Sequence, residues 1–87
     1  MTQQLKDALR ILRIKQVKAQ MGLPNSTIYD HIGKGLFCHP IKLSERCSGW
    51  LESEVTAIMG ARISGKSEAD IKSLVIELEN QRLTNWG

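Results

Sequence analysis

The sequence predicts a mainly α-helical fold that carries one small β-hairpin. Apolar residues recur at helical spacing in four segments, a Gly-Leu-Pro break at residues 22–24 separates two of these segments, and residues 41–43 alternate between apolar and polar. At 87 residues the chain can bury one modest core and is too short for several domains. We therefore predict one compact unit over residues 1–65 and a helical extension over residues 66–87.

The N-terminal part predicts a short strand followed by a helix. Residues 9–14 read Leu-Arg-Ile-Leu-Arg-Ile, which we interpret as a short strand that leads into the helix. Ile14, Val17 and Met21 then fall on one side at helical spacing, which predicts an amphipathic helix over residues 15–21. The Gly-Leu-Pro break ends it, because glycine adopts the left-handed cap conformation and proline cannot continue the helix.

A second short helix is expected to begin directly after the proline. Residues 25–27 are Asn-Ser-Thr, whose side-chain oxygens can accept hydrogen bonds from the unpaired amides of a first helical turn. Ile28 and Ile32 lie four apart and are expected to face a core, and Gly33 and Gly35 end the helix. Two short helices joined by about four residues that include a glycine have the spacing of a helix-turn-helix.

A β-hairpin is expected after Pro40. Residues 41–43 (Ile-Lys-Leu) form the first strand, residues 44–46 the turn and residues 47–50 the second strand. A hairpin this small is marginal alone and must pack on helices. Leu43 and Trp50 are its expected anchors.

Two further helices complete the prediction. Glu52 and Glu54 stand in the first turn of the third helix, where they favour the positive end of its dipole, and this helix ends near residues 64–65. The fourth helix runs from about Ser67 to Thr84. Its apolar stripe consists of Ile71, Leu74, Val75 and Leu78. The stripe either packs on the core of the domain itself or binds a second copy or a regulatory partner, and both interpretations stay open.

The charges divide the chain into a basic and an acidic part. Residues 1–50 contain eight Lys or Arg against three Asp or Glu, a net charge of +5, whereas residues 51–87 contain four bases against six acids, a net charge of −2. This asymmetry is typical of a polyanion-binding module with a separate structural or partner-binding end. A solvated surface with scattered charges is the alternative.

Composition argues against several classes of protein. The chain is 41% hydrophobic and 24% charged, as expected for a folded globular protein, and it contains no apolar run near the roughly 18 residues of a membrane-spanning helix. Charged residues in the first 13 positions argue against a signal peptide. We expect a cytoplasmic protein without a membrane partner, and we assume no disulfide between Cys38 and Cys47.

Neither a metal site nor an active site is expected. Cys38, His39, Cys47 and His31 are of the residue types that bind zinc, but they lack paired-cysteine spacing. The cysteines are interpreted as small hydrophobic residues and His31 as a partly buried, hydrogen-bonded histidine. Glu52 and Glu54 diverge on a helix, and residues 33–35 (Gly-Lys-Gly) lack the rest of a phosphate-binding loop. We therefore expect no cofactor, no metal and no enzymatic activity.

Three segments carry a resemblance to a known family. Residues 22–29 (GLPNSTIY), 40–43 (PIKL) and 49–55 (GWLESEV) resemble the AlpA-like prophage regulatory proteins, and the resemblance covers about Leu9 to Ile63. These are small winged helix-turn-helix proteins, related in architecture to excisionases and to the DNA-binding heads of MerR-type regulators. The resemblance implies sequence-specific binding of duplex DNA in a bacterial cell, at the nucleoid, with the second helix in the major groove and the hairpin wing on the backbone or minor groove.

The residues at these positions suggest particular contacts. The candidate DNA-binding residues are Asn25, Ser26, Thr27, Tyr29, Asp30, Lys34, Lys42 and Arg46. The hydroxyls of Ser26 and Thr27 either bond phosphates or base edges or cap the helix, and Asn25 can bond adenine. Tyr29 either contacts the DNA backbone or packs at the edge of the core.

The charged candidates have different expected roles. Lys34 and Lys42 would contact phosphates, and Arg46, at the position of the family's wing arginine, would contact a phosphate or a narrow minor groove. Asp30 is repelled by phosphates and can accept a hydrogen bond from cytosine. Members of the family commonly carry arginine where this chain has Asn25 and Asp30, and Phe-Pro-Lys-Pro where it has Phe-Cys-His-Pro at residues 37–40. The operator sequence is therefore not predicted.

The expected function is regulation of the transcription of phage or mobile-element genes. Because one module contacts few base pairs, we expect a homodimer or cooperative loading on adjacent sites. One alternative is an excisionase-like factor that bends attachment-site DNA and directs an integrase. A second is an adaptor that binds a regulatory protein through its C-terminal helix.

Overall fold

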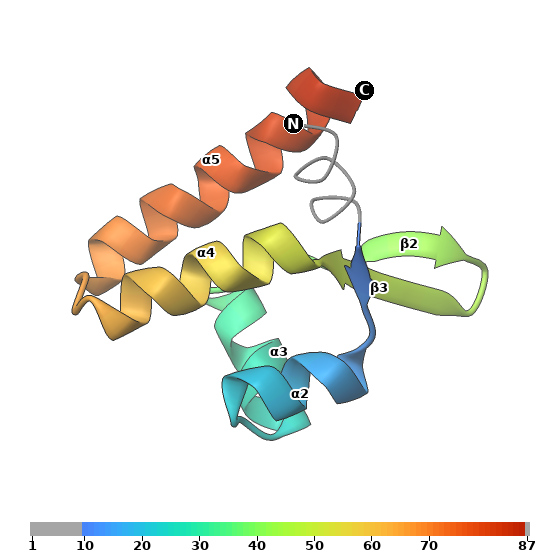
Figure 1. Ribbon diagram of the computed structural model, residues 1–87, viewed down its shortest axis with the longest axis horizontal. Helices are drawn as coiled ribbons and strands as arrows, with labels where there is room; N and C mark the ends of the chain where they lie inside the picture. The colour runs from blue at the N-terminus through green and yellow to red at the C-terminus, as the bar shows by residue number, and fades with distance from the viewer. Residues whose placement is uncertain (1–9, 87) are drawn as a thin grey trace.

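The computed structural model describes residues 10–86, except for the side chain of Trp86, so Leu9 at the start of the predicted first strand lies outside the described part. The elements follow in the order β1 (Ile11–Leu12), α2 (Ile14–Met21), α3 (Asn25–Gly33), β2 (Ile41–Ser44), β3 (Cys47–Leu51), α4 (Glu52–Ile63) and α5 (Glu68–Trp86) (Figure 1). A mainly helical fold with a small β-sheet confirms the predicted class, a winged helix-turn-helix followed by a C-terminal helix.

The sheet has one strand more than the predicted hairpin. Its order is β1-β3-β2, all antiparallel, because β1 pairs with β3 through Ile11 opposite Leu51 and Leu12 opposite Trp50. Gly49 permits this approach, since a Cβ atom there would lie 2.5 Å from the Cγ2 of Ile11 and 2.9 Å from the carbonyl oxygen of Leu12. The N-terminal strand therefore holds the base of the wing.

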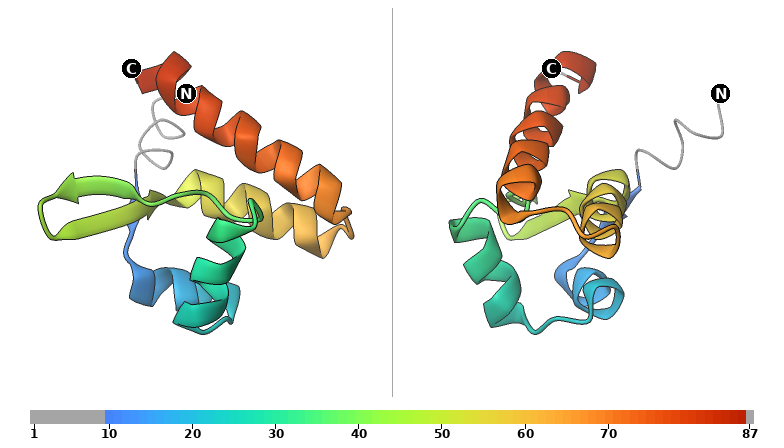
Figure 2. Two further views of the ribbon diagram at one scale, coloured as in Figure 1. Left: turned by 180° about the vertical axis from the view of Figure 1, so that it is seen from behind. Right: turned by 90° about the vertical axis from the view of Figure 1, so that its left-hand side faces the viewer.

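The helix-turn-helix forms as the sequence predicts. Gly22 ends α2 in the left-handed conformation, with φ of 70°, and its N–H donates to the carbonyl of Lys18 at 2.8 Å. Val17 of α2 and Ile28 of α3 are buried in the common core. The two helices lie on the side of α4 that faces away from α5 (Figures 1 and 2).

Trp50 anchors the wing in the core, as predicted, but Leu43 does not. The side chain of Trp50 is buried, and its Nε1 donates to the carbonyl oxygen of Cys38 at 2.9 Å. Leu43 is 45% exposed, because the β2–β3 hairpin extends sideways past the helices and its outer half has no helix to pack against (Figure 1). The expectation that Leu43 is a core anchor is wrong.

The C-terminal helix packs on the same core. Ile71 and Val75 are almost fully buried, and Leu74 and Leu78 pack against the core from its edge. Within residues 10–86 the apolar stripe is thus covered by the domain itself. A partner that binds these four side chains would have to displace α5 from the core. Binding of a second copy or of a regulatory protein through the stripe therefore stays a prediction.

Polar contacts fasten the far end of α5 to the rest of the domain. Arg82 forms two hydrogen bonds with the buried carboxylate of Glu54, from Nε to Oε2 at 2.9 Å and from Nη2 to Oε1 at 2.6 Å. Its Nη2 also donates to the carbonyl oxygen of His39 at 2.8 Å, and the backbone N–H of His39 donates to Glu79 at 2.8 Å. These bonds tie α5 to the segment that enters the wing.

Candidate nucleic-acid interface

One face of α3 is exposed and polar. Ser26, Tyr29, Asp30 and Lys34 are exposed, whereas Ile28 is buried on the opposite side. Spacings of three, four and seven residues place Ser26, Tyr29 and Gly33 along one line of the helix surface. Asn25 is exposed and Thr27 is half-buried in the first turn. The prediction that Ile28 and Ile32 face the core is therefore confirmed, whereas Thr27, which was expected on the outward side, is half-buried.

The start of α3 differs from the expected capping arrangement. Pro24 is the cap residue, and its carbonyl oxygen accepts the N–H groups of Thr27 and Ile28 at 3.1 Å each. Asn25, Ser26 and Thr27 form the first turn itself, and α3 has no side-chain cap. The capping interpretation of these residues is wrong, because the helix starts directly after the proline. Their side chains are consequently available for other partners.

Asp30 and Lys34 neutralise each other on this face. The Lys34 Nζ lies 3.0 Å from the Asp30 carboxylate, one helical turn apart, and both side chains are more than half exposed. An exposed pair of this kind is worth about 0–1 kcal/mol. It therefore restrains Lys34 only weakly, and a phosphate can compete for it.

The wing places two further candidates away from α3. Lys42 is exposed on β2, and Arg46 is exposed in the turn between β2 and β3. The pairing of β2 with β3 is irregular between Lys42 and Ser44. Five of the eight candidates thus lie on α3, Lys34 is its C-cap residue, and two lie on a separate projecting element.

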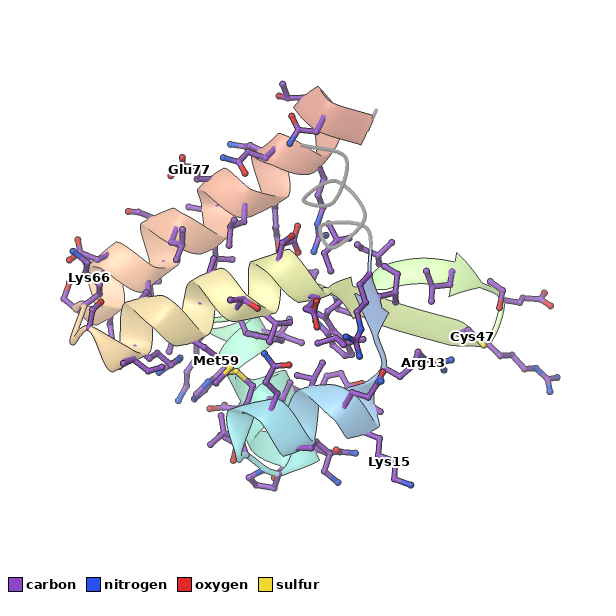
Figure 3. The ribbon with its side chains drawn as sticks, viewed as in Figure 1. Arg13, Lys15, Cys47, Met59, Lys66 and Glu77 are labelled. Atoms are coloured by element: carbon purple, nitrogen blue, oxygen red, sulfur yellow. The ribbon has the colours of Figure 1, made fainter. Side chains whose placement is uncertain are left out.

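Two basic residues near the wing were not singled out by sequence reasoning. Arg13 precedes α2 and extends toward the hairpin near Cys47, and Lys15 projects from the first turn of α2 (Figure 3). A hydrogen bond from Ser44 and the positive charge of Arg13 hold the pKa of Cys47 below its ordinary value. Only the pairing of β1 with β3 brings Arg13 to this position, and no local pattern in the sequence signals that pairing.

Tyr29 stands at the border between the exposed face and the core. Its side chain is 51% exposed, and its ring centroid lies 6.5 Å from that of Trp50 with an interplanar angle of 59°. Tilted aromatic pairs at this separation are favourable. A core-edge role and a DNA contact are both compatible with this position.

The residues considered for zinc binding have other partners. His31 is half-buried, and its Nδ1 lies 3.3 Å from Nη2 of Arg62, which confirms the prediction of a partly buried, hydrogen-bonded histidine. Cys38 is buried, and this burial, with the charge of Glu54, raises the pKa of its thiol to about 12. Cys38 and Cys47 are free thiols. Within the described residues, no three potential ligands gather at one point.

Comparison with known families identifies the chain. The family model described as prophage CP4-57 regulatory protein (AlpA) matches residues 10–63. The chain belongs to the AlpA family. The match spans the helix-turn-helix, the wing and α4, and α5 of this AlpA-family chain lies outside it. The family description supports a regulatory role and the resemblance noted in the sequence.

A phage protein is similar to the same AlpA-family chain. An uncharacterized protein, ORF88, of Enterobacteria phage P4 is 46% identical over 57 residues, which cover 66% of this chain and 65% of the relative. The matched segment thus spans just under two thirds of that relative. No solved structure matches the chain. None of the helices within residues 10–86 is both long and apolar enough to cross a membrane.

Proposed function

We propose that this AlpA-family protein binds duplex DNA and regulates the transcription of phage or mobile-element genes. In this proposal α3 enters the major groove with its exposed face, and the wing contacts the backbone or minor groove. The observation that carries the proposal is the first turn of α3, where the exposed Asn25 and Ser26 and the half-buried Thr27 do not cap their own helix.

The chemistry of this surface supports groove binding. A first turn with unpaired amides favours a phosphate, and side-chain hydroxyl and amide groups can bond base edges. Lys42 and Arg46 are exposed on the wing, Arg13 adds positive charge beside the wing, and Lys15 adds a further cation on the first turn of α2. Phosphate contacts position such a module, and base contacts specify its site.

The mode of loading follows from the size of the module. A single domain of this kind buries roughly 600–1,000 Å² on DNA, which supports only modest affinity. We propose that two copies pair or load cooperatively on adjacent sites. An integrase or regulatory protein as an additional partner remains part of this proposal.

Selection of bound duplexes from a random pool tests the proposal. We expect a recovered consensus, and Thr27→Ala is expected to weaken binding to it by roughly 1–3 kcal/mol while leaving non-specific binding unchanged. Thr56→Ala, at an exposed position of α4, is the matched control. Failure of the full chain to bind any duplex in low-salt buffer would contradict the proposal.

The wing is tested by salt dependence. Arg46→Ala is expected to weaken binding to all sequences similarly and to reduce the slope of log affinity against log salt by about one unit. Lys66 is an exposed cation in the connection between α4 and α5, and Lys66→Ala is expected to leave the slope unchanged.

Phased-bend gel-shift measurements on the selected site then distinguish a regulator from an excisionase-like factor, which must bend its site.

A further inference from the structure

A cavity lies between the helix-turn-helix and the C-terminal end of α4. It has a volume of about 250 Å³. Its lining residues are Met21, Leu23, His31, Met59, Arg62 and Ile63. The first three come from the end of α2, the turn and α3, and the other three come from α4. Met59 lies on the side of α4 that faces α2 (Figure 3). The cavity thus has an apolar wall on both sides.

Arg62 lines this apolar cavity and has a hydrogen-bond donor without a partner among the described residues. Its Nε is buried and has no hydrogen-bond partner. Among residues 10–86, no carboxylate lies within ion-pair distance of its guanidinium. A guanidinium carries five N–H donors and favours planar, two-point contact with a carboxylate. The arginine therefore has donor capacity and charge that the described part of the chain does not match.

The neighbouring histidine does not supply the missing charge. Arg62 can only donate, so the 3.3 Å contact requires Nδ1 of His31 to accept. Burial and the positive charge of Arg62 lower the pKa of His31, against the opposing charges of Asp30 and Glu68, and this direction favours the neutral ring. The imidazole thus orients the guanidinium without neutralising it.

We propose that this cavity binds a small apolar carboxylic acid. The carboxylate would pair with the Arg62 guanidinium, and the hydrocarbon part would pack against Met21, Leu23 and Met59. Two flexible thioether side chains suit such a site, because methionine adapts to irregular apolar shapes. The volume is below the roughly 300–1,000 Å³ of sites for drug-sized ligands, so the class is a short-chain or single-ring acid.

The site is separate from the proposed DNA contacts. Its lining contains none of the eight candidate DNA-binding residues. Because an occupant would touch both α4 and the helix-turn-helix, it would bind the folded chain in preference to the unfolded one and raise the melting temperature. The inference therefore stands or fails independently of DNA binding.

Titration of the full chain with octanoate tests the inference. Backbone amide NMR signals of residues 21–23, 31 and 59–63 and the methyl signals of Met21 and Met59 are expected to shift and to saturate. Octan-1-ol has the same chain without the charge, and we expect it to bind at least about tenfold more weakly. Equal binding of the acid and the alcohol would show a merely apolar patch and would overturn the proposal. So would the absence of saturable shifts at these positions.

Substitutions test whether Arg62 supplies the positive charge that binds the carboxylate. Arg62→Gln is expected to weaken octanoate binding about tenfold or more, and Arg62→Lys, which retains a cation, is expected to lose less. Lys66→Gln removes a nearby exposed cation and is expected to change nothing. Unchanged affinity in Arg62→Gln would overturn the proposal. If that variant does not fold, the comparison of acid with alcohol on the wild-type chain decides it.

Discussion

Within the described residues, Arg82 of α5 neutralises the buried carboxylate of Glu54. The Glu54 side chain is 5% exposed, and Arg82 contacts both of its oxygens. Removing one partner of a buried pair leaves an uncompensated charge in the core, which costs about 3–5 kcal/mol. Arg82→Leu is expected to lower the free energy of unfolding by about this amount, as measured by urea denaturation.

Another ion pair of the same molecule provides the control. Arg10 and Glu52 lie 3.3 Å apart, but the arginine side chain is 60% exposed. Arg10→Ala should therefore cost no more than about 1 kcal/mol. A double variant, Glu54→Leu with Arg82→Leu, is expected to recover much of the loss, because it leaves no unpaired charge. A small effect of Arg82→Leu alone would contradict this account.

Substitution of Gly33 is expected to affect the stability of the chain and its binding of DNA in opposite directions. It is exposed on the line of Ser26 and Tyr29, and a Cβ atom there would meet nothing within 4 Å. Gly33→Ala is expected to raise the free energy of unfolding by up to about 1 kcal/mol and to weaken DNA binding, since the methyl group would stand in the interface. Thermal unfolding and gel shift measure the two effects.

The control for this substitution lies on α4. Gly60 is also exposed, and a Cβ atom there meets nothing within 4 Å. Gly60→Ala should stabilise the chain without changing its affinity for DNA. If Gly33→Ala binds DNA as tightly as the wild type, the proposed face of α3 is not the contact surface.

His31 makes stability depend on pH. Burial and the charge of Arg62, with a smaller effect of Lys34, lower its pKa from 6.5, against the opposing effects of Asp30 and Glu68. Below pH 6.5 the unfolded chain binds the proton before the folded chain does, so the contribution present at higher pH is lost as the pH falls toward the lowered value.

We expect the wild type to lose more stability than His31→Gln between about pH 8 and pH 5.5. The urea midpoints of both proteins at the two pH values measure the difference. His39→Gln is the control, since it keeps His31 and should therefore retain this part of the pH dependence. Parallel losses in the wild type and His31→Gln would contradict the prediction.

At the scale of elements, α5 is a structural part of the domain. Ile71 and Val75 are in the core, and Arg82 neutralises Glu54. Deletion of residues 66–87 is therefore expected to unfold the chain, as seen by circular dichroism, and cannot report on an adaptor function. The double variant Ile76→Ser with Leu83→Ser is suitable for testing partner binding through α5, because these side chains are 62% and 74% exposed. This variant is expected to remain folded, and a folded deletion product would contradict the role given to α5.

Local patterns in the sequence predict most elements of this fold. Apolar periodicity and the Gly-Leu-Pro break place α2, α3, α4 and α5 within a few residues of their observed bounds. The pairing of β1 with β3, the exposure of Leu43 and the position of Arg13 were not predictable, because each depends on contacts between segments far apart in the chain. Arg62 is a comparable case, since its isolated charge becomes evident only when α4 packs against the turn.

At the scale of the whole molecule, positive and negative charges are concentrated on opposite sides of α4. The helix-turn-helix and wing contain the exposed cations Lys15, Lys18, Lys34, Lys42 and Arg46, whereas α5 contains four acids and two bases and lies on the other side of α4 (Figure 2). A polyanion would be attracted to the first side and repelled by the second. This arrangement favours one orientation on DNA and leaves α5 facing away from it.

The buried indole of Trp50 also gives the domain an optical signal. It lies beside Phe37, with ring centroids 6.1 Å apart, and beside Tyr29 of α3. In a Trp86→Phe background its fluorescence comes from this one site, and a ligand that displaces the phenol ring of Tyr29 alters the emission of the neighbouring indole. Occupation of the exposed face of α3 can therefore be followed without attaching a dye.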